Sequence, residues 1–282
     1  MYSLSVGDEF IDPGSEAYVS LENIVHSETS GYIDMNTPNT YTLQYYAIDD
    51  QDNEETVLVK VLVLSNYYQD AVGLSGNELL LELRYIINTN VTMQNYDAAR
   101  YILNITDRDP NNPDNVILVY TGYSVDGDWY CPASNDCTWN REHVWPQSLL
   151  DVNTTGSSTH VGADLHNLKP ADPGTNSSRG NKYFDNTTTT LSYAPRDEVK
   201  GDIARMLFYM TVMYDYLELI NGTPTTYQMA MLDILIEWHE QDVVDEFEQN
   251  RNDVIYTYQN NRNPFIDYPD FYALIFNPNY SN

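Results

Sequence analysis

Glu142 and His143 begin the part of the chain that is richest in chemically useful side chains, residues 140–184. A carboxylate beside an imidazole places a hard oxygen ligand next to a base that titrates near neutrality. Asn176 adds a second hard oxygen, and such ligands suit Mg²⁺ or Ca²⁺ better than zinc. Arg179 follows Asn176 by three residues, so on a helix the two share a face and the guanidinium can hold a phosphate. These residues predict metal-assisted cleavage of a phosphodiester bond.

The elements that carry these residues must bring them to one side. Adjacent residues of a strand point to opposite faces, so Glu142 and His143 can serve one site only if the strand ends or twists there. Pro146 follows closely and favours a strand end. The Pro/Gly turn before Asn176 is typical of a helix start.

The chain is strongly acidic, but its charge is unevenly distributed. Thirteen Lys and Arg residues stand against 42 Asp and Glu residues, which gives a formal net charge of −29. This excess repels nucleic acid at long range. Residues 1–64 carry only Lys60 against 12 carboxylates. Seven basic residues fall between 141 and 205, so the expected site is less acidic than the rest: Arg141, Lys169, Arg179, Lys182, Arg196, Lys200 and Arg205.

The other histidines permit a rival interpretation. His143, His160, His166 and Asp164 could form a zinc set, but their spacing is a weak pattern, and a catalytic zinc needs three firm ligands in fixed geometry. We therefore expect Asp164 and His166, together with Asn167, to support the metal-binding helix through hydrogen bonds.

The cysteines and the first residues of the chain indicate the cellular compartment of the protein. Cys131 and Cys137 enclose a short polar segment, which favours a disulfide over a metal pair because a structural zinc needs four ligands. No apolar run reaches the roughly 18 residues of a membrane span. Met1 is followed by no secretion leader. We expect a secreted or cell-surface protein whose leader has been removed.

Residues 1–64 predict an all-β domain. The runs 41–48 and 56–64 are rich in β-branched and aromatic residues and flank the turn cluster DDQDNEE, which predicts a hairpin. Earlier strands are expected at 2–6 and 17–21. The pattern IDMNTPNTYTLQYYAIDDQDNEETVLVKVLVL resembles bacterial immunoglobulin-like surface modules. The resemblance implies a small β-sandwich that acts as a spacer or adhesion module.

A polar, glycine-containing linker at 65–75 then leads into a second domain, residues 76–282. Apolar residues recur at helical spacing from Leu79 to Ile87, and VILVY at 116–120 reads as a buried strand. The sequence predicts further helices at 96–103, 202–219, 225–240 and 243–258. The predicted fold class is α+β: a mainly helical domain with a small central sheet, preceded by the all-β module.

Several separated blocks carry a family resemblance. REHVWPQS and DLHNLKPADPGTNSSRGN resemble the endonuclease I family of the ββα-metal (His-Me finger) nucleases, especially its secreted bacterial members. Further blocks extend the resemblance over residues 68–272. In that family a ββα element places a histidine base at a strand end and a metal-binding asparagine on the following helix. The resemblance assigns the base to His143 and the metal ligands to Glu142 and Asn176. It implies non-specific cleavage of DNA and RNA that leaves 5′-phosphate and 3′-hydroxyl ends.

The phosphate clamp departs from the family pattern. Some members place a clamping arginine after the EHV motif, but residues 148–163 contain no Arg or Lys. Arg179 is our first candidate for this role, with Arg141 and Arg251 next. Asn181 and Lys182 are expected to contact the nucleic-acid backbone.

Two functional hypotheses follow. The first is an Mg²⁺-dependent nuclease, with Ca²⁺ or Mn²⁺ as alternative ions, which acts as a monomer on DNA or RNA without an obligate protein partner. The alternative is a surface binding or adhesion protein with a nuclease-like fold and no catalysis. The complete set of Glu142, His143 and Asn176 favours the nuclease, because a binding protein has no need of it.

Overall fold

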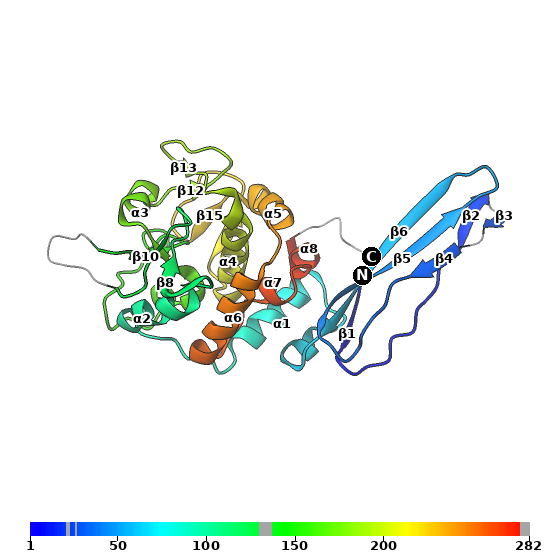
Figure 1. Cartoon of the computed structure of the whole chain (residues 1–282), viewed down its shortest axis with the longest axis horizontal. Helices are drawn as coiled ribbons and strands as arrows, with labels where there is room; N and C mark the ends of the chain where they lie inside the picture. Colours follow the sequence, from blue (N-terminus) through cyan, green and yellow to red (C-terminus); the bar gives the residue numbers. More distant parts are fainter. Residues whose placement is uncertain (21–22, 26, 130–136, 277–282) are drawn as a thin grey trace. The chain divides into compact units, whose positions relative to one another are not determined.

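A computed structural model describes residues 1–20, 23–25, 27–129 and 137–276, and the chain divides into two compact units (Figure 1). The first comprises Met1–Ile86 with the C-terminal stretch from Ala273, and the second is Ile87–Tyr272. The sequence placed the boundary at residues 65–75, ahead of helix α1 (Gly76–Asn88). The compact units divide near the C-terminal end of that helix.

The N-terminal part of the first unit is all-β, as predicted. One sheet has the order β1-β6-β5-β4, and β2 and β3 form a separate pair. In the hairpin of β5 and β6, Leu43 pairs with Val59. The Asp49 carboxylate closes its turn by accepting hydrogen bonds from the backbone of Gln51 and Asn53, both at 2.8 Å. The strands are β1 (Tyr2–Ser5), β2 (Ala17–Ser20), β3 (Asn23–Val25), β4 (Ser27–Ser30), β5 (Asn39–Ile48) and β6 (Glu54–Leu64).

A 3₁₀ turn, η1 (Asn66–Ala71), leads from β6 to α1. Helix α1 buries Leu79, Leu83 and Ile87, which are four residues apart and form the apolar face that the sequence predicted.

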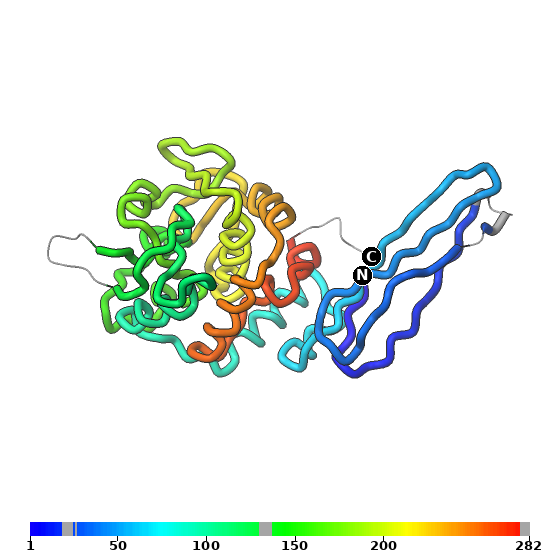
Figure 2. Tube along the Cα trace, viewed as in Figure 1, coloured from blue at the N-terminus to red at the C-terminus, as the bar shows by residue number. Residues whose placement is uncertain are grey.

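Helices dominate the second unit, which confirms the predicted class. Helix α4 runs through its middle, and every residue from Gly201 to Met213 is buried (Figure 1; Figure 2). No helix of the described chain is long and apolar enough to cross a membrane. The remaining helices are α2 (Tyr96–Thr106), α3 (Pro173–Arg179), α4 (Lys200–Met213), α5 (Leu232–Gln241), α6 (Glu246–Gln259), α7 (Pro264–Asp267) and, from the second unit into the first, α8 (Phe271–Phe276).

Short strands and 3₁₀ turns connect these helices. The strands pair as β7-β8-β9, β10-β11, β12-β13 and β14-β15. They are β7 (Arg108–Asp109), β8 (Asn112–Ile117), β9 (Ser124–Asp126), β10 (Asn140–His143), β11 (Leu168–Ala171), β12 (Tyr183–Phe184), β13 (Ser192–Tyr193), β14 (Glu218–Ile220) and β15 (Gln228–Ala230). The turns are η2 (Val161–Ala163), η3 (Leu165–Asn167) and η4 (Asp197–Val199).

Three predicted elements differ in extent. The strand expected at 116–120 ends at Ile117, because the chain turns and Gly122 N–H bonds the Leu118 carbonyl at 2.8 Å. Helix α4 ends at Met213 rather than 219, since Tyr214 turns extended and its hydroxyl reaches Asp164 at 2.8 Å. The helix expected at 225–240 begins only at Leu232, after strand β15.

A hydrophobic cluster includes Leu168 of β11 and Trp139, which directly precedes β10. It joins residues of α2, β8, β11 and α6, so the strands that carry the candidate site rest on well-packed elements. Its buried members are Ala99, Ile102, Leu103, Val116, Leu118, Trp139, Leu165, Leu168 and Ile255.

Candidate active site

Two antiparallel strands and a helix form the frame of the site. In β10 and β11, Glu142 pairs with Lys169 and His143 with Leu168. Helix α3 follows directly: Asp172 caps it by accepting from the Thr175 N–H at 2.7 Å, with proline at the first turn. It ends at Gly180, whose φ of 56° is a conformation that glycine adopts without steric cost. This is the ββα order that the family resemblance implied.

Glu142, His143 and Asn176 all line one cavity. Strand β10 ends at His143, as Pro146 led us to expect, so neighbouring residues can face the same space. The cavity has a volume of about 300 Å³ and is lined by Arg141, Glu142, His143, Pro146, Gln147, Ser148, Asn176, Gly180 and Asn181.

His143 is oriented and kept neutral by its surroundings. Its side chain is 7% exposed, and Nε2 lies 2.7 Å from the Gly162 carbonyl oxygen. A carbonyl can only accept, so the proton resides on Nε2 and Nδ1 keeps its lone pair. Burial lowers the pKa of His143 to about 4, against the opposing effect of the Gly162 carbonyl. The imidazole is therefore an unprotonated base at neutral pH.

Glu142 is a buried carboxylate held from two sides. Tyr120 Oη and Arg179 Nη1 both donate to its Oε1, at 2.5 and 2.8 Å. Burial raises the pKa of Glu142, and Arg179 opposes that rise. Oε2 takes no part in either bond. Tyr120 was missed by the sequence reasoning, although it stands at the end of the recognised VILVY run.

Arg179 does not lie where a phosphate clamp would. It is fully buried, and beyond its bond to Glu142 it donates to the carbonyls of His143 and Val144 at 2.9 and 2.6 Å. Its guanidinium also lies 4.6 Å from the Phe184 ring centroid. The spacing from Asn176 suggested a shared helix face, but the long side chain turns back into the protein.

Asn176 is positioned by a residue that the sequence reasoning missed. Its Nδ2 donates to Asn140 Oδ1 at 2.8 Å, which leaves the amide oxygen of Asn176 outside this bond. Asn140 stands at the start of β10, so it links this strand to α3.

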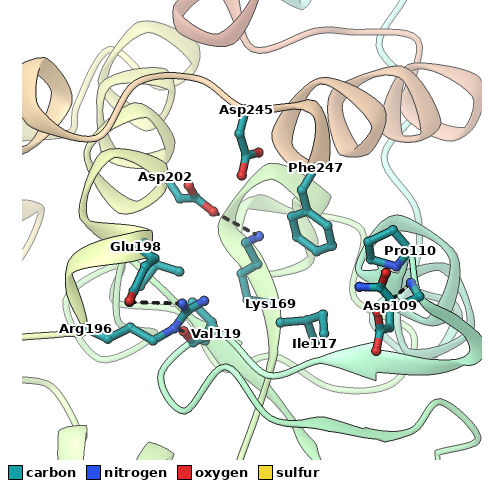
Figure 3. Close-up of a pocket in the computed structure, with 12 residues that line it drawn as sticks. Asp109, Pro110, Ile117, Val119, Lys169, Arg196, Glu198, Asp202, Asp245 and Phe247 are labelled. Atoms are coloured by element: carbon teal, nitrogen blue, oxygen red, sulfur yellow. Dashed lines mark hydrogen bonds and ion pairs between the residues drawn. The ribbon is translucent and has the colours of Figure 1, made fainter.

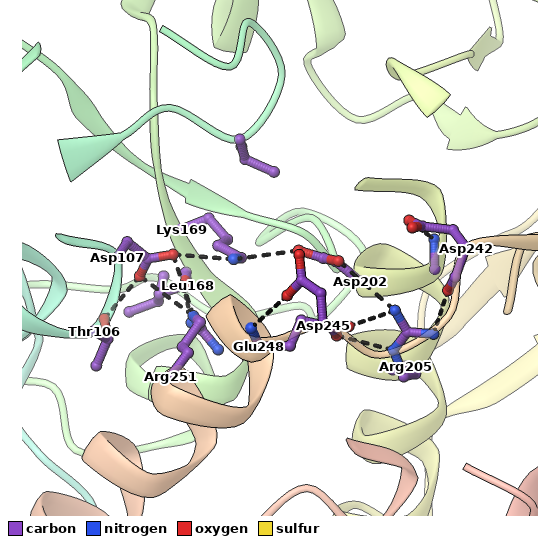
Figure 4. A network of polar contacts seen from close by, with 12 residues as sticks. Thr106, Asp107, Leu168, Lys169, Asp202, Arg205, Asp242, Asp245, Glu248 and Arg251 are labelled. Atoms are coloured by element: carbon purple, nitrogen blue, oxygen red, sulfur yellow. Dashed lines mark hydrogen bonds and ion pairs between the residues drawn. The ribbon is translucent and has the colours of Figure 1, made fainter. Parts of the chain in front are cut away.

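The remaining predicted contacts separate into two groups. Arg141 and Asn181 line the cavity, and Lys182, which is half-buried, follows Asn181 directly. Arg251 is buried instead: its Nη2 donates to the carbonyls of Leu165 and Leu168 at 2.7 and 2.5 Å (Figure 4). Its predicted nucleic-acid contact is therefore corrected, because α6 directs this side chain into the core.

Asp164 supports the scaffold rather than α3. Its carboxylate accepts from the hydroxyls of Tyr209 and Tyr214 at 3.0 and 2.8 Å and from Gln259 Nε2 at 2.8 Å. These bonds tie η3 to the region of α4 and to α6. The predicted support of the metal-binding helix by Asp164 is thus corrected.

The other predicted supports act elsewhere. His166 Nε2 faces the Asn261 carbonyl at 3.4 Å, so it does not contact α3 either. Asn167 instead steadies the end of β10, because it bonds both the N–H and the carbonyl of Trp145, at 2.7 and 3.2 Å.

The zinc interpretation finds no support in the described ranges, where no three His, Cys, Asp or Glu side chains gather as a metal site. His160 caps η2, where its Nδ1 accepts from Gly162 N–H at 3.1 Å. The predicted disulfide involves Cys131, which lies outside the described residues.

A second cavity of about 240 Å³ contains cations that are already paired (Figure 3). Lys169 lies 3.7 Å from Asp202, and Arg196 lies 3.3 Å from Glu198. Lys169 also pairs with Asp107 at 3.0 Å, within a buried network that continues toward Arg205 (Figure 4). These pairs hold α4, α6 and β11 together.

The comparison with known proteins agrees with this frame. The profile of the endonuclease I family matches residues 75–194 and 186–270, and that of the bacterial surface protein Ig-like domain matches residues 1–63. The chain belongs to the endonuclease I family. Family membership identifies it as a nuclease, a hydrolase that acts on nucleic acid.

Individual relatives agree with this family. The chain is 43% identical over 225 residues to the extracellular ribonuclease of Bacillus subtilis (strain 168), a match that covers 73% of this chain and 76% of that protein. The extracellular ribonuclease of Bacillus amyloliquefaciens matches with the same identity and coverage. A lipoprotein structure from Bacteroides thetaiotaomicron is 29% identical over 23% of this chain and 33% of that one, with a TM-score of 0.21 that carries no argument about the fold.

Proposed function

We propose that this nuclease is a metal-dependent, sequence-non-specific endonuclease that hydrolyses phosphodiester bonds of DNA and RNA, with His143 as the general base. The observation that carries the proposal is the shared cavity, which is lined by the residues of a neutral imidazole, a buried carboxylate and an amide: His143, Glu142 and Asn176. The 5′-phosphate and 3′-hydroxyl ends follow from the family resemblance.

His143 has the properties that a base needs. Its Nε2 is fixed on the Gly162 carbonyl, so Nδ1 can take a proton from the attacking water. As Nδ1 becomes protonated, the same carbonyl stabilises the imidazolium through its bond to Nε2. Tyr96 stacks on the ring, with centroids 5.5 Å apart, and limits its rotation.

Glu142 and Asn176 fit a hard cation. Glu142 keeps Oε2 outside its bonds to Tyr120 and Arg179, and Asn176 keeps its amide oxygen outside the bond to Asn140. One or two such oxygens are enough for Mg²⁺ when phosphate and water complete the shell, and Ca²⁺ or Mn²⁺ are alternatives. When bound, the ion supplies Lewis-acid stabilisation of the charge on the phosphate oxygens.

We assign different roles to Arg179 and Arg141. Arg179 is assigned as a positioning residue, because it holds the Glu142 carboxylate and contacts no solvent. Arg141 lines the cavity and is assigned as the phosphate contact, with Asn181 and Lys182 along the backbone of the substrate.

RNA is the first substrate to test. We also propose that the protein is secreted or displayed at the cell surface. Both relatives are named extracellular ribonucleases, and the N-terminal module matches a bacterial surface domain.

The decisive test compares wild type with His143→Ala on plasmid DNA and total RNA, with Mg²⁺ or with EDTA. We expect cleavage only with Mg²⁺ and a loss of about 10²- to 10⁴-fold in the variant, the usual contribution of a general base. Calorimetric Mg²⁺ affinity should stay near the wild-type value. Equal cleavage by the variant would remove the base assignment, and binding without cleavage by wild type would favour an adhesion protein.

A further inference from the structure

Arginine and aromatic side chains alternate along a path that begins beside His143. Tyr96, which stacks on the His143 ring, also lies under the Arg141 guanidinium, 3.5 Å from ring centroid to Cζ. Because Arg141 lines the catalytic cavity, this end of the path is adjacent to the site of cleavage.

The path continues away from the cavity. Arg141 lies 5.9 Å from the Trp129 ring, and Arg100 lies 4.7 Å from the same ring. Arg100 is also 4.9 Å from the ring of Tyr101. We call these five residues the arginine–aromatic ladder: Tyr96, Arg141, Trp129, Arg100 and Tyr101.

The ladder arginines are poorly paired within the protein. Arg100 makes no hydrogen bond to any described residue, its Nε is buried without a partner, and its carboxylate contact, Asp97, is 3.9 Å away. Arg141 shares the same Asp97 at 4.0 Å and otherwise donates to the Tyr96 carbonyl. Their guanidinium groups therefore keep donors for an external anion.

Other arginines of this unit are paired much more closely. Arg179 lies 2.8 Å from Glu142 and is fully buried. Arg262 lies 2.7 Å from Asp267. The carboxylate contacts of Arg100 and Arg141 are therefore longer than those of these two arginines.

Tyr101 is the most exposed aromatic member, whereas Tyr96 and Trp129 are partly buried against the hydrophobic core. Tyr101 is 64% exposed, although its position on α2 could have carried any polar residue, and Trp129 is half-buried. An exposed ring beside a guanidinium can stack a nucleobase while the cation contacts the adjacent phosphate.

We propose that the arginine–aromatic ladder is a subsite for single-stranded nucleic acid flanking the cleaved bond. The inference rests on the proposed nuclease function and adds a substrate preference to it. Stacking needs base faces, which a duplex hides and a single strand offers. A chain with a net charge of −29 repels phosphates at long range, so stacking contributes where long-range attraction does not.

The test measures kcat/KM of the full chain with Mg²⁺ on a fluorescent 12-nucleotide single strand, as DNA and as RNA, and on a 12-base-pair duplex. Tyr101→Ala should lower the ratio of single-strand to duplex kcat/KM by about tenfold, mainly through KM, and Arg100→Gln should act in the same direction. Tyr101→Phe, which keeps the ring, should restore the ratio.

A substrate with a run of abasic nucleotides separates stacking from a structural role. This substrate should lower the kcat/KM of wild type by about the same factor as Tyr101→Ala does. It should not lower the kcat/KM of Tyr101→Ala any further. Tyr123→Ala and Arg108→Gln are matched controls, because both residues are exposed and neither belongs to the ladder. A wild-type ratio in Tyr101→Ala, or an equal fall in Tyr123→Ala, would overturn the subsite. Absence of cleavage of every substrate by wild type would instead remove the nuclease proposal.

Discussion

At the scale of single residues, the site depends on groups that hold other groups in place. Glu142 is buried with its carboxylate held by Arg179 and Tyr120, and His143 is a neutral base because burial lowers its pKa, although its bond to the Gly162 carbonyl opposes that shift. Removing a partner from such a group leaves it uncompensated. A substitution of such a partner should therefore cost more free energy than the loss of one hydrogen bond.

Arg179→Met should destabilise the fold and weaken Mg²⁺ binding together. Loss of one partner of a buried ion pair costs about 3–5 kcal/mol, and the isolated Glu142 carboxylate would take up a proton and lose its value as a ligand. Thermal unfolding and calorimetric Mg²⁺ titration measure the two effects. Arg205→Met is the matched control, since Arg205 is equally buried and pairs with Glu248 away from the site. Equal loss of Mg²⁺ affinity in the control would contradict the positioning role.

At the scale of elements, β10, β11 and α3 together form the site. Helix α3 is short, spanning Pro173–Arg179, so its own propensity contributes little and its position depends on caps and packing. The Asp172 cap, the Asn140–Asn176 bond and Gly180 at its end fix that position.

Asp172→Ala should cost about 1 kcal/mol of folding stability through the lost cap, and it should also weaken Mg²⁺ binding because Asn176 is displaced. Asp245→Ala removes the equivalent cap of α6, where the side chain accepts from the Glu248 N–H at 2.9 Å. This control should lose similar stability with wild-type Mg²⁺ affinity. Chemical denaturation and calorimetry compare the two variants, and unchanged Mg²⁺ affinity in Asp172→Ala would exclude the proposed role of α3.

At the scale of the whole molecule, the acidic charge restricts how a nucleic acid can bind. Most cations of the second unit belong to internal ion pairs, such as those of Lys169 and Arg205, so few remain for phosphates. Binding should then depend on the divalent ion more than on long-range attraction.

The salt dependence of binding tests this view. With about three phosphate contacts, the slope of log K against log salt on a single strand should be near −2. Addition of Ca²⁺ should raise the affinity of His143→Ala for the oligonucleotide by more than a change in salt concentration does. Fluorescence anisotropy of a labelled oligonucleotide gives both quantities. Tight binding in EDTA with a much steeper slope would contradict the prediction.

The sequence determined the features that local chemistry encodes: the all-β N-terminal part, the hairpin of runs 41–48 and 56–64, most helices, and the set of Glu142, His143 and Asn176. Periodicity and motif spacing specify these without knowledge of distant contacts. Tertiary structure alone decided that Arg179 and Arg251 turn inward, that Tyr120 and Asn140 bond Glu142 and Asn176, and that α4 stops at Met213. These outcomes depend on which remote group a polar side chain reaches, and burial makes an unpaired group costly enough to override local preference.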